Sequence, residues 1–114
     1  MAAGRGEMSF DLQRTLEEMV KAARKAAGRD SGKVTQAVRE VLEDQRQALE
    51  AIARARLANT IDDDEMRQQL DDERLAFQAG LSMAKAMGKA AVQKAANAAF
   101  EALAKAIRQA AGIA

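Results

Sequence analysis

IDDDEMRQQLDDERLAFQAGLSMAKAMGKAAVQKAANAAFEALAKAIRQAA, residues 61–111, is the stretch that decides the fold, because it fills almost half of the 114-residue chain without a proline. Its apolar and small residues recur at a step of eleven positions, as in the series Leu70, Leu81, Val92 and Leu103. Eleven residues make three turns at about 3.67 residues per turn, so such a face runs almost straight along a helix. The pattern predicts one long helix with a single apolar face.

The side chains on the apolar face of this predicted helix become smaller toward the carboxyl end, where alanine and glycine replace the bulkier Met66, Leu70 and Phe77. Small side chains let a second helix approach closely, although each one buries little apolar surface. A straight helix over 61–111 would be about 75 Å long at 1.5 Å per residue, which exceeds the length of a compact domain of this size. We therefore expect its second half to be left uncovered by its own chain.

Two glycines, Gly80 and Gly88, are the places where the long helix could break and fold back into a four-helix bundle. One glycine inside a helix costs only about 1 kcal/mol, and the segment has no proline, Asn-Gly or Ser-Gly turn. Continuity is therefore favoured. The expected fold is all-α, with a helical hairpin followed by one long C-terminal helix in an oligomerising three-helix chain. The four-helix bundle is the alternative.

The first half of the chain carries the pattern of two shorter amphipathic helices. Ser9 is suited to cap the first helix, and Gly28 is suited to end it in a left-handed conformation. The second helix is expected over 33–57, so residues 28–32 connect it to the first helix. A connection of this length is typical of antiparallel neighbours. These two helices are expected to form the hairpin, while residues 1–8 are expected to be a disordered lead before a single domain over 9–114.

An acidic cluster at 62–65 follows Thr60 at the start of the long segment. Thr60 with Asp63 three positions later resembles a capping box, and acidic side chains in a first turn are favoured by the helix dipole. The same carboxylates could hold Ca²⁺ or Mg²⁺, but the central glycine of an EF-hand loop is absent. Helix capping is therefore the better interpretation, and no metal site is expected.

Composition excludes several kinds of active site. The chain has neither histidine nor cysteine, so the usual zinc ligands, the Glu-x-x-His pairs of di-iron bundles, disulfides and thiol chemistry are ruled out. No serine or threonine lies beside a glycine-rich oxyanion loop, and no phosphate-binding glycine motif is present. We expect a protein that is not an enzyme, with no catalytic residues and no cofactor.

The overall balance of residues is typical of long helices or coiled coils, because alanine is the most frequent residue and proline, tryptophan and tyrosine are absent. A formal charge of +1 gives no net attraction to nucleic acid or membrane. No apolar run reaches the roughly 18 residues of a membrane span, and the amino terminus lacks the apolar core of a signal peptide. A cytoplasmic location is the expectation.

Basic side chains flank the apolar face of the carboxyl-terminal part, at Lys85, Lys89, Lys94, Lys105 and Arg108. A helix of this kind can lie on a membrane or storage-granule surface. The segment has no tryptophan or tyrosine, however, and alanine contributes little to transfer into lipid, so a helix–helix interface is favoured. Nucleic acid is not an expected partner, because a dense basic region is absent and the acidic cluster would repel phosphate.

Charge is distributed unevenly along the chain. Residues 60–74 carry seven acids against two arginines, a net charge of −5, and residues 84–114 carry five bases against one glutamate, a net charge of +4. Two copies that pair antiparallel would bring the acidic segment of one against the basic segment of the other. Exposed ion pairs are weak, so these charges would orient the dimer more than they would strengthen it.

These patterns predict a small helical protein that associates with itself through its alanine-rich face and acts as a structural, scaffold or adaptor component. The expected partner is a second copy, in an antiparallel dimer or a higher oligomer, or another helical protein. The alternatives are a peripheral protein that coats membrane or storage-granule surfaces and a regulatory binder of nucleic acid or protein. The predicted interface consists of Leu81, Ala84, Gly88, Ala91, Val92, Ala95, Ala99, Leu103 and Ala106.

Overall fold

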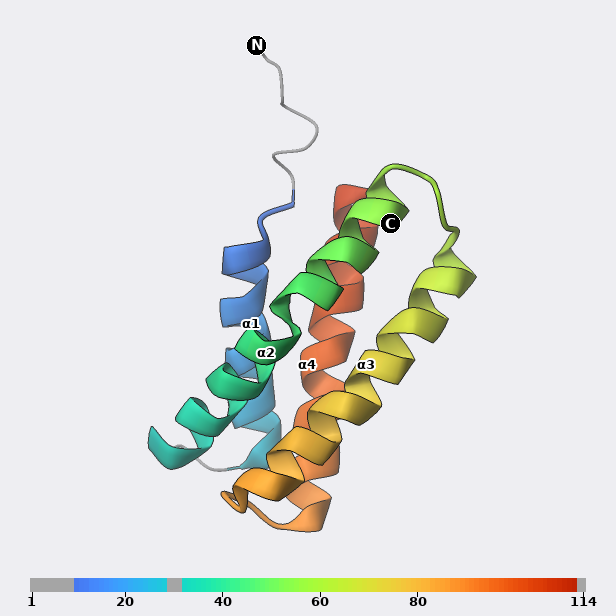
Figure 1. Ribbon diagram of the computed structural model, residues 1–114. Coiled ribbons are helices and arrows are strands. Elements are labelled where there is room, and N and C mark those ends of the chain that lie inside the picture. The colour runs from blue at the N-terminus through green and yellow to red at the C-terminus, as the bar shows by residue number, and fades with distance from the viewer. Residues whose placement is uncertain (1–9, 29–31, 113–114) are drawn as a thin grey trace.

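Four α-helices run alternately up and down through the described part of the chain (Figure 1). The computed structural model describes residues 10–28 and 32–112. The helices are α1 (Leu12–Ala27), α2 (Gly32–Leu57), α3 (Asp63–Ala84) and α4 (Lys89–Ala110). The all-α class is confirmed, whereas the expectations for residues 1–8 and for Ser9 fall outside the described residues.

The single long helix predicted over 61–111 is wrong, because the chain reverses between α3 and α4. Lys85 ends α3 in the left-handed conformation at φ 54°, and its N–H donates to the carbonyl of Ser82 at 3.3 Å. Gly88 then precedes α4 in an extended conformation at φ −76°. The four-helix alternative therefore describes the fold, and the break lies beside Gly88 and not at Gly80.

The reversal is favoured because it covers the apolar face of α4. The buried residues of this helix are Val92, Ala95, Ala96, Ala99, Phe100, Leu103 and Ile107. Burial of each large aliphatic or aromatic side chain contributes about 1.5–3 kcal/mol, which together outweighs the roughly 1–2 kcal/mol cost of a left-handed lysine. A continuous helix would leave this face in water. The chain consequently measures 44 × 26 × 24 Å and does not form the predicted rod.

The alanine-rich face of α4 packs against α1, the helix with which α4 makes its most extensive contact. Small side chains permit this close approach, as the sequence suggested, but the helix that occupies the face belongs to the same chain. Of the predicted interface residues, Leu81, Val92, Ala95, Ala99 and Leu103 are buried, Ala91 and Ala106 are half-buried, and Ala84 and Gly88 are exposed at the connection between α3 and α4.

The other extensive contact joins α2 to α3. Gly80 of α3 lies at a close approach of the two helices, since a Cβ at this position would be 2.8 Å from Cγ1 of Val41 in α2. A real Cβ does not tolerate so short a contact unless the valine moves. The glycine at position 80 therefore allows close packing, and it does not interrupt its helix.

α1 and α2 run in opposite directions, although each packs more extensively against another helix. Gly28 ends α1 in the left-handed conformation at φ 71°, as predicted. At the surface, Nη1 of Arg39 donates to Oε2 of Glu17 at 2.6 Å and links the two helices. This hydrogen bond lowers the pKa of Glu17 below its usual value.

α3 begins with a capping box, but its members differ from those predicted. The carboxylate of Asp62 accepts from the N–H of Glu65 at 2.8 Å, and the carboxylate of Glu65 accepts from the N–H of Asp62 at 2.9 Å. Thr60 instead donates from its hydroxyl to the carbonyl of Ala55 at 2.9 Å. Asp63 is thereby left outside the box, in the first turn of α3, where it contacts arginines from three helices.

Substitution of Lys85 by glycine is expected to raise the free energy of unfolding by about 0.5–1 kcal/mol, because glycine adopts the left-handed conformation without steric cost. In a continuous helix the same change would lower the stability by about 1 kcal/mol. Chemical denaturation followed by circular dichroism measures the difference. Lys85→Ala is the control, since alanine keeps the Cβ that opposes this conformation. A loss of stability in Lys85→Gly would contradict the reversal.

Substitution of Ala95 by glutamate is expected to lower the free energy of unfolding by more than about 4 kcal/mol, because it places an unpaired carboxylate in the core beside α1. Ala90→Glu in the exposed first turn of the same helix should change the stability by less than about 0.5 kcal/mol. Thermal unfolding compares the two variants. If Ala95→Glu only dissociated an oligomer of intact subunits, the packing of α4 inside its own chain would be refuted.

Candidate functional site

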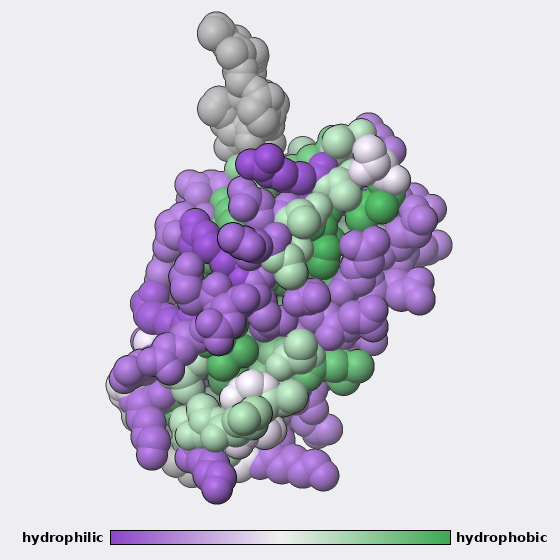
Figure 2. Space-filling view, viewed as in Figure 1, coloured by the Kyte–Doolittle hydropathy of each residue, from purple (hydrophilic) through white to green (hydrophobic). Residues whose placement is uncertain are grey.

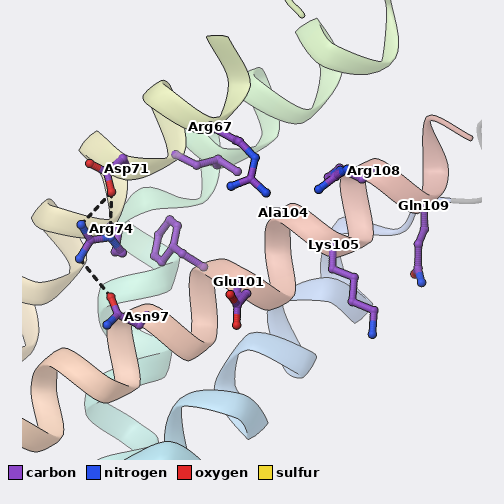
Figure 3. A pocket seen from close by; sticks show the side chains of 11 residues that line it. Arg67, Asp71, Arg74, Asn97, Glu101, Ala104, Lys105, Arg108 and Gln109 are labelled. Atoms are coloured by element: carbon purple, nitrogen blue, oxygen red, sulfur yellow. Dashed lines mark hydrogen bonds and ion pairs between the residues drawn. The ribbon is translucent and has the colours of Figure 1, made fainter. Parts of the chain in front are cut away.

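A groove of about 620 Å³ lies between α3 and α4 (Figure 3). Its lining residues come from one side of each helix: Arg67, Leu70, Asp71 and Arg74 from α3, and Asn97, Phe100, Glu101, Ala104, Lys105, Arg108 and Gln109 from α4. Both sets repeat at spacings of three and four residues, which is the period of one helix face. The antiparallel course of α3 and α4 brings the two faces together.

The floor of the groove is apolar. Leu70 and Phe100 are only 4% and 5% exposed, so their side chains belong to the core as well as to the groove. The ring of Phe100 also packs on Phe77, with the ring centroids 5.6 Å apart. Such a tilted aromatic pair adds to the packing energy of the core beneath the groove.

The charged side chains of the groove give it a positive net charge. Arg67, Arg74, Lys105 and Arg108 are opposed by Asp71 and Glu101 alone, so the lining carries a net charge of +2. Figure 3 shows Arg67 and Arg108 extending toward each other from the two helices, whereas Lys105 and Gln109 point away from α3. The positive charge is therefore concentrated at the Arg67 and Arg108 end.

Asp63 is the carboxylate that contacts the arginines at this end of the groove. Its Oδ2 lies 3.6 Å from Nε of Arg108 and 3.9 Å from Nε of Arg67, and its Oδ1 lies 3.7 Å from Nε of Arg56. All three separations are too long for a hydrogen bond. Within the described residues, Oδ1 of Asp63 and the Nε atoms of Arg56 and Arg108 are buried without a hydrogen-bond partner.

Helix ends explain part of this cluster. Asp63 lies in the first turn of α3, and Arg56 and Arg108 lie in the last turns of α2 and α4, which are the positions that the helix dipoles favour for these charges. The ion pairs of Asp63 thus link the start of α3 to the ends of α2 and α4. It does not balance the charge, because three guanidinium groups share one carboxylate and a net charge of +2 is left.

At the opposite end of the groove, the guanidinium group of Arg74 has hydrogen-bond partners within the groove itself. Nη2 and Nε of Arg74 donate to Oδ1 of Asp71 at 2.7 and 3.0 Å, and Nη1 donates to Oδ1 of Asn97 at 3.2 Å. Arg74 therefore links α3 to α4, and few of its N–H groups are left to bind a further anion. The capacity for a further anion lies with Arg67 and Arg108, whose only ion pairs in the described structure are with Asp63.

The chemistry that the groove offers is recognition of a carboxylate or a phosphate group. Guanidinium groups bind both through paired N–H donors. The lining includes no hydroxyl, thiol or imidazole group, and its carboxylates are those of Asp71 and Glu101. In the described residues, no group of three or more acidic side chains is placed to hold a metal ion.

Only part of this site can be predicted from the sequence. The pattern marks Lys105 and Arg108 as basic residues that flank an apolar face, whereas Arg67 and Arg74 lie within an acidic segment, whose net charge hides them. The seven-residue spacing of Arg67 and Arg74, two helical turns, was the available signal. It becomes informative only when α4 is known to lie antiparallel beside α3. No family model, curated protein or solved structure matches the chain.

Substitution of Asp63 by asparagine is expected to lower the free energy of unfolding by about 1–2 kcal/mol, because three guanidinium groups are then left without a carboxylate. Sulfate added at constant ionic strength should raise the melting temperature of this variant more than that of the wild type, since a dianion can replace the lost carboxylate. Further substitution by Arg67→Gln and Arg108→Gln should abolish the sulfate effect. An equal sulfate response in all three proteins would refute anion selection by the cluster.

Proposed function

We propose that the chain is a non-enzymatic binding module, acting as an adaptor or scaffold component, that holds an acidic segment of another protein in the groove between α3 and α4. The observation that carries this proposal is the pair Arg67 and Arg108, which face each other and share Oδ2 of Asp63 at 3.9 and 3.6 Å. A carboxylate from a partner would supply the short, charge-assisted hydrogen bonds that Asp63 does not make.

The groove has the length and the lining for a peptide segment. Its α4 side extends from Asn97 to Gln109, which is about 18 Å at 1.5 Å per residue. That distance corresponds to about three turns of a helix or five extended residues. The half-buried Ala104 offers a small apolar surface to a partner, while the arginines suit its acidic residues.

The other expected roles find less support. Self-association remains compatible with an adaptor role, but the apolar face of α4 is buried and is not the surface for it. Coating of a membrane or granule would need that same face to be exposed. No described helix combines the length and the apolar character of a membrane span. Nucleic acid is disfavoured because Asp71 and Glu101 lie among the groove's bases. A cytoplasmic location is part of the proposal.

The test uses a synthetic helical peptide of about three turns with glutamates on one face and leucines on the other. Titration of the ¹⁵N-labelled protein should shift the amide signals of the groove residues in α3 and α4. Replacement of the glutamates by glutamine should abolish these shifts, and added salt should reduce the affinity. No perturbation of the groove at millimolar peptide would overturn the proposal.

Paired arginine variants show whether binding depends on this site. Arg67→Gln combined with Arg108→Gln is expected to weaken the peptide about tenfold or more, because both guanidinium contacts are removed. The matched control is Arg14→Gln combined with Arg54→Gln, which removes the same charge from α1 and α2 away from the groove. If both pairs weaken the peptide equally, the attraction is to general positive charge and the groove is not the site.

A further inference from the structure

One end of the bundle is strongly basic. The four helices run alternately up and down, so the end of α1, the start of α2, the end of α3 and the start of α4 lie together (Figure 1). The described residues of these segments, 21–28, 32–39 and 76–94, carry eight bases and no acid. These three segments form the basic end of the bundle.

The rest of the chain has the opposite charge. Arg29 and Asp30 cancel each other and the whole chain carries +1, so the residues outside the basic end carry a net charge of −7. The bundle is 44 Å long. Exposed charges separated by more than a Debye length, about 10 Å at 0.1 M salt, are largely screened from each other. An anion at the basic end is therefore attracted by the bases there and is only weakly repelled by the acids near the other end.

Lysines supply the exposed charge of the basic end, one from each helix. Lys25 lies in the last turn of α1, Lys33 in the first turn of α2, Lys85 at the end of α3 and Lys89 at the start of α4. All four are exposed, and none takes part in an ion pair among the described residues. Figure 2 shows hydrophilic side chains projecting at the lower edge of the molecule, where these helix ends lie. Their ammonium groups are thus available to an external anion.

Two of these lysines lie where the helix dipole disfavours a base. The N-terminus of a helix carries a partial positive charge, so it favours acidic side chains and opposes basic ones. α3, which begins at the other end of the bundle, follows this rule with three acids in its first turn. α2 and α4 have no acid in their first turns and carry Lys33 and Lys89 there. Helix stability does not explain these two lysines, whereas an external anion would be attracted both by them and by the helix N-termini.

An anionic lipid surface fits the layout of these charges better than a nucleic acid does. The four lysines come from four helices, so they spread over the 26 × 24 Å cross-section of the bundle and do not follow one line. A membrane presents its charge as a plane, whereas a nucleic acid presents it along a backbone. The described basic end has no exposed aromatic side chain on which a base could stack, since Phe77 is buried. Met83, 81% exposed in the last turn of α3, offers an apolar side chain to lipid.

We infer that the basic end attaches the chain to the surface of an anionic lipid membrane, with Met83 entering the interface. Each basic side chain close to such a surface raises the partition coefficient about fivefold. Attachment by charge at the helix ends leaves the apolar face of α4 buried against α1. Arg67 and Arg108 lie near the start of α3 and the end of α4, away from the membrane, so the groove stays accessible.

Flotation with large unilamellar vesicles tests the attachment. The protein should float with phosphatidylcholine vesicles that contain about 30% phosphatidylserine at about 50 mM salt, and it should not float with pure phosphatidylcholine. About 500 mM salt should release it, because the attraction is screened. No binding to the anionic vesicles at low salt would overturn the inference. A DNA duplex that bound at the same salt, when the vesicles did not, would assign the basic end to nucleic acid and would also overturn it.

Charge reversal at the two helix starts should move binding and stability in opposite directions. Lys33→Glu combined with Lys89→Glu is expected to lower the partition coefficient about a hundredfold or more, because two attractive charges become repulsive. The same change should raise the melting temperature, since glutamate suits a helix N-terminus. A loss of vesicle binding in this variant therefore cannot come from unfolding. If the variant still bound the vesicles as the wild type does, the basic end would not be the contact surface.

A matched variant separates the basic end from the net charge of the protein. Arg14→Glu combined with Lys105→Glu makes the same change in net charge at exposed positions toward the other end of the bundle. Its partition coefficient should stay within about threefold of the wild type, because these positions lie beyond a Debye length from the membrane. Equal losses in the two double variants would show that the attraction has no specific site, and the inference would be wrong.

Tryptophan fluorescence shows which end faces the lipid. The chain has no tryptophan, so Met83→Trp provides a single reporter. Its emission should shift to shorter wavelength when anionic vesicles are added, because the indole leaves water. Ala51→Trp, at an exposed position of α2 toward the other end, is the control and should not shift. An unchanged emission from Met83→Trp on bound vesicles would show that another surface faces the lipid.

Discussion

The packing of α4 against α1 is the interaction on which the rest of the structure depends. Alanine buries little surface per residue, so a contact made of alanines must be both close and long to stabilise a fold. α4 meets both conditions, with Ala95, Ala96 and Ala99 fully buried within a helix of 22 residues. The reversal after Lys85 follows from this contact, because only a reversed α4 can reach α1.

The groove is a by-product of the same reversal. When α4 turns back beside α3, the acidic start of α3 comes to lie next to the basic end of α4, and Asp63 meets Arg108 at 3.6 Å. The uneven charge along the sequence is thus partly matched inside one chain. It is not fully matched, because Arg67 and Arg56 approach the same carboxylate. The excess of guanidinium over carboxylate is what makes this surface suited to anions.

Local features of the fold could be predicted from the sequence, and the long-range arrangement could not. The all-α class, the end of α1 at Gly28 and the close-packing character of the alanine face all follow from propensity and periodicity. The periodic pattern shows that a face will be covered, but not which helix covers it. A single glycine does not by itself break a helix, but a continuous helix would leave Phe100, Leu103 and Ile107 in water, and the local pattern does not reveal this cost.

The candidate site was less accessible to prediction for the same reason. Arg67 and Arg108 stand on different helices and meet only through the reversal, so no local pattern joins them. The sequence predicts the position of Asp63 in an acidic first turn, but its contacts with three arginines depend on the relative positions of α2, α3 and α4. Spacing within one helix identifies the members of a face. Only the tertiary fold identifies the opposing face.

The pairing of the first described helix with the last has a consequence for biosynthesis. Translation delivers α1 to the ribosomal exit long before α4, and until α4 emerges the apolar side of α1, including Met19 and Ala23, has no permanent cover. α2 and α3 can associate earlier, because they are neighbours in sequence. A nascent chain therefore completes this core only after α4 has been synthesised, and a ribosome that stalls before α4 holds a chain whose α1 remains uncovered.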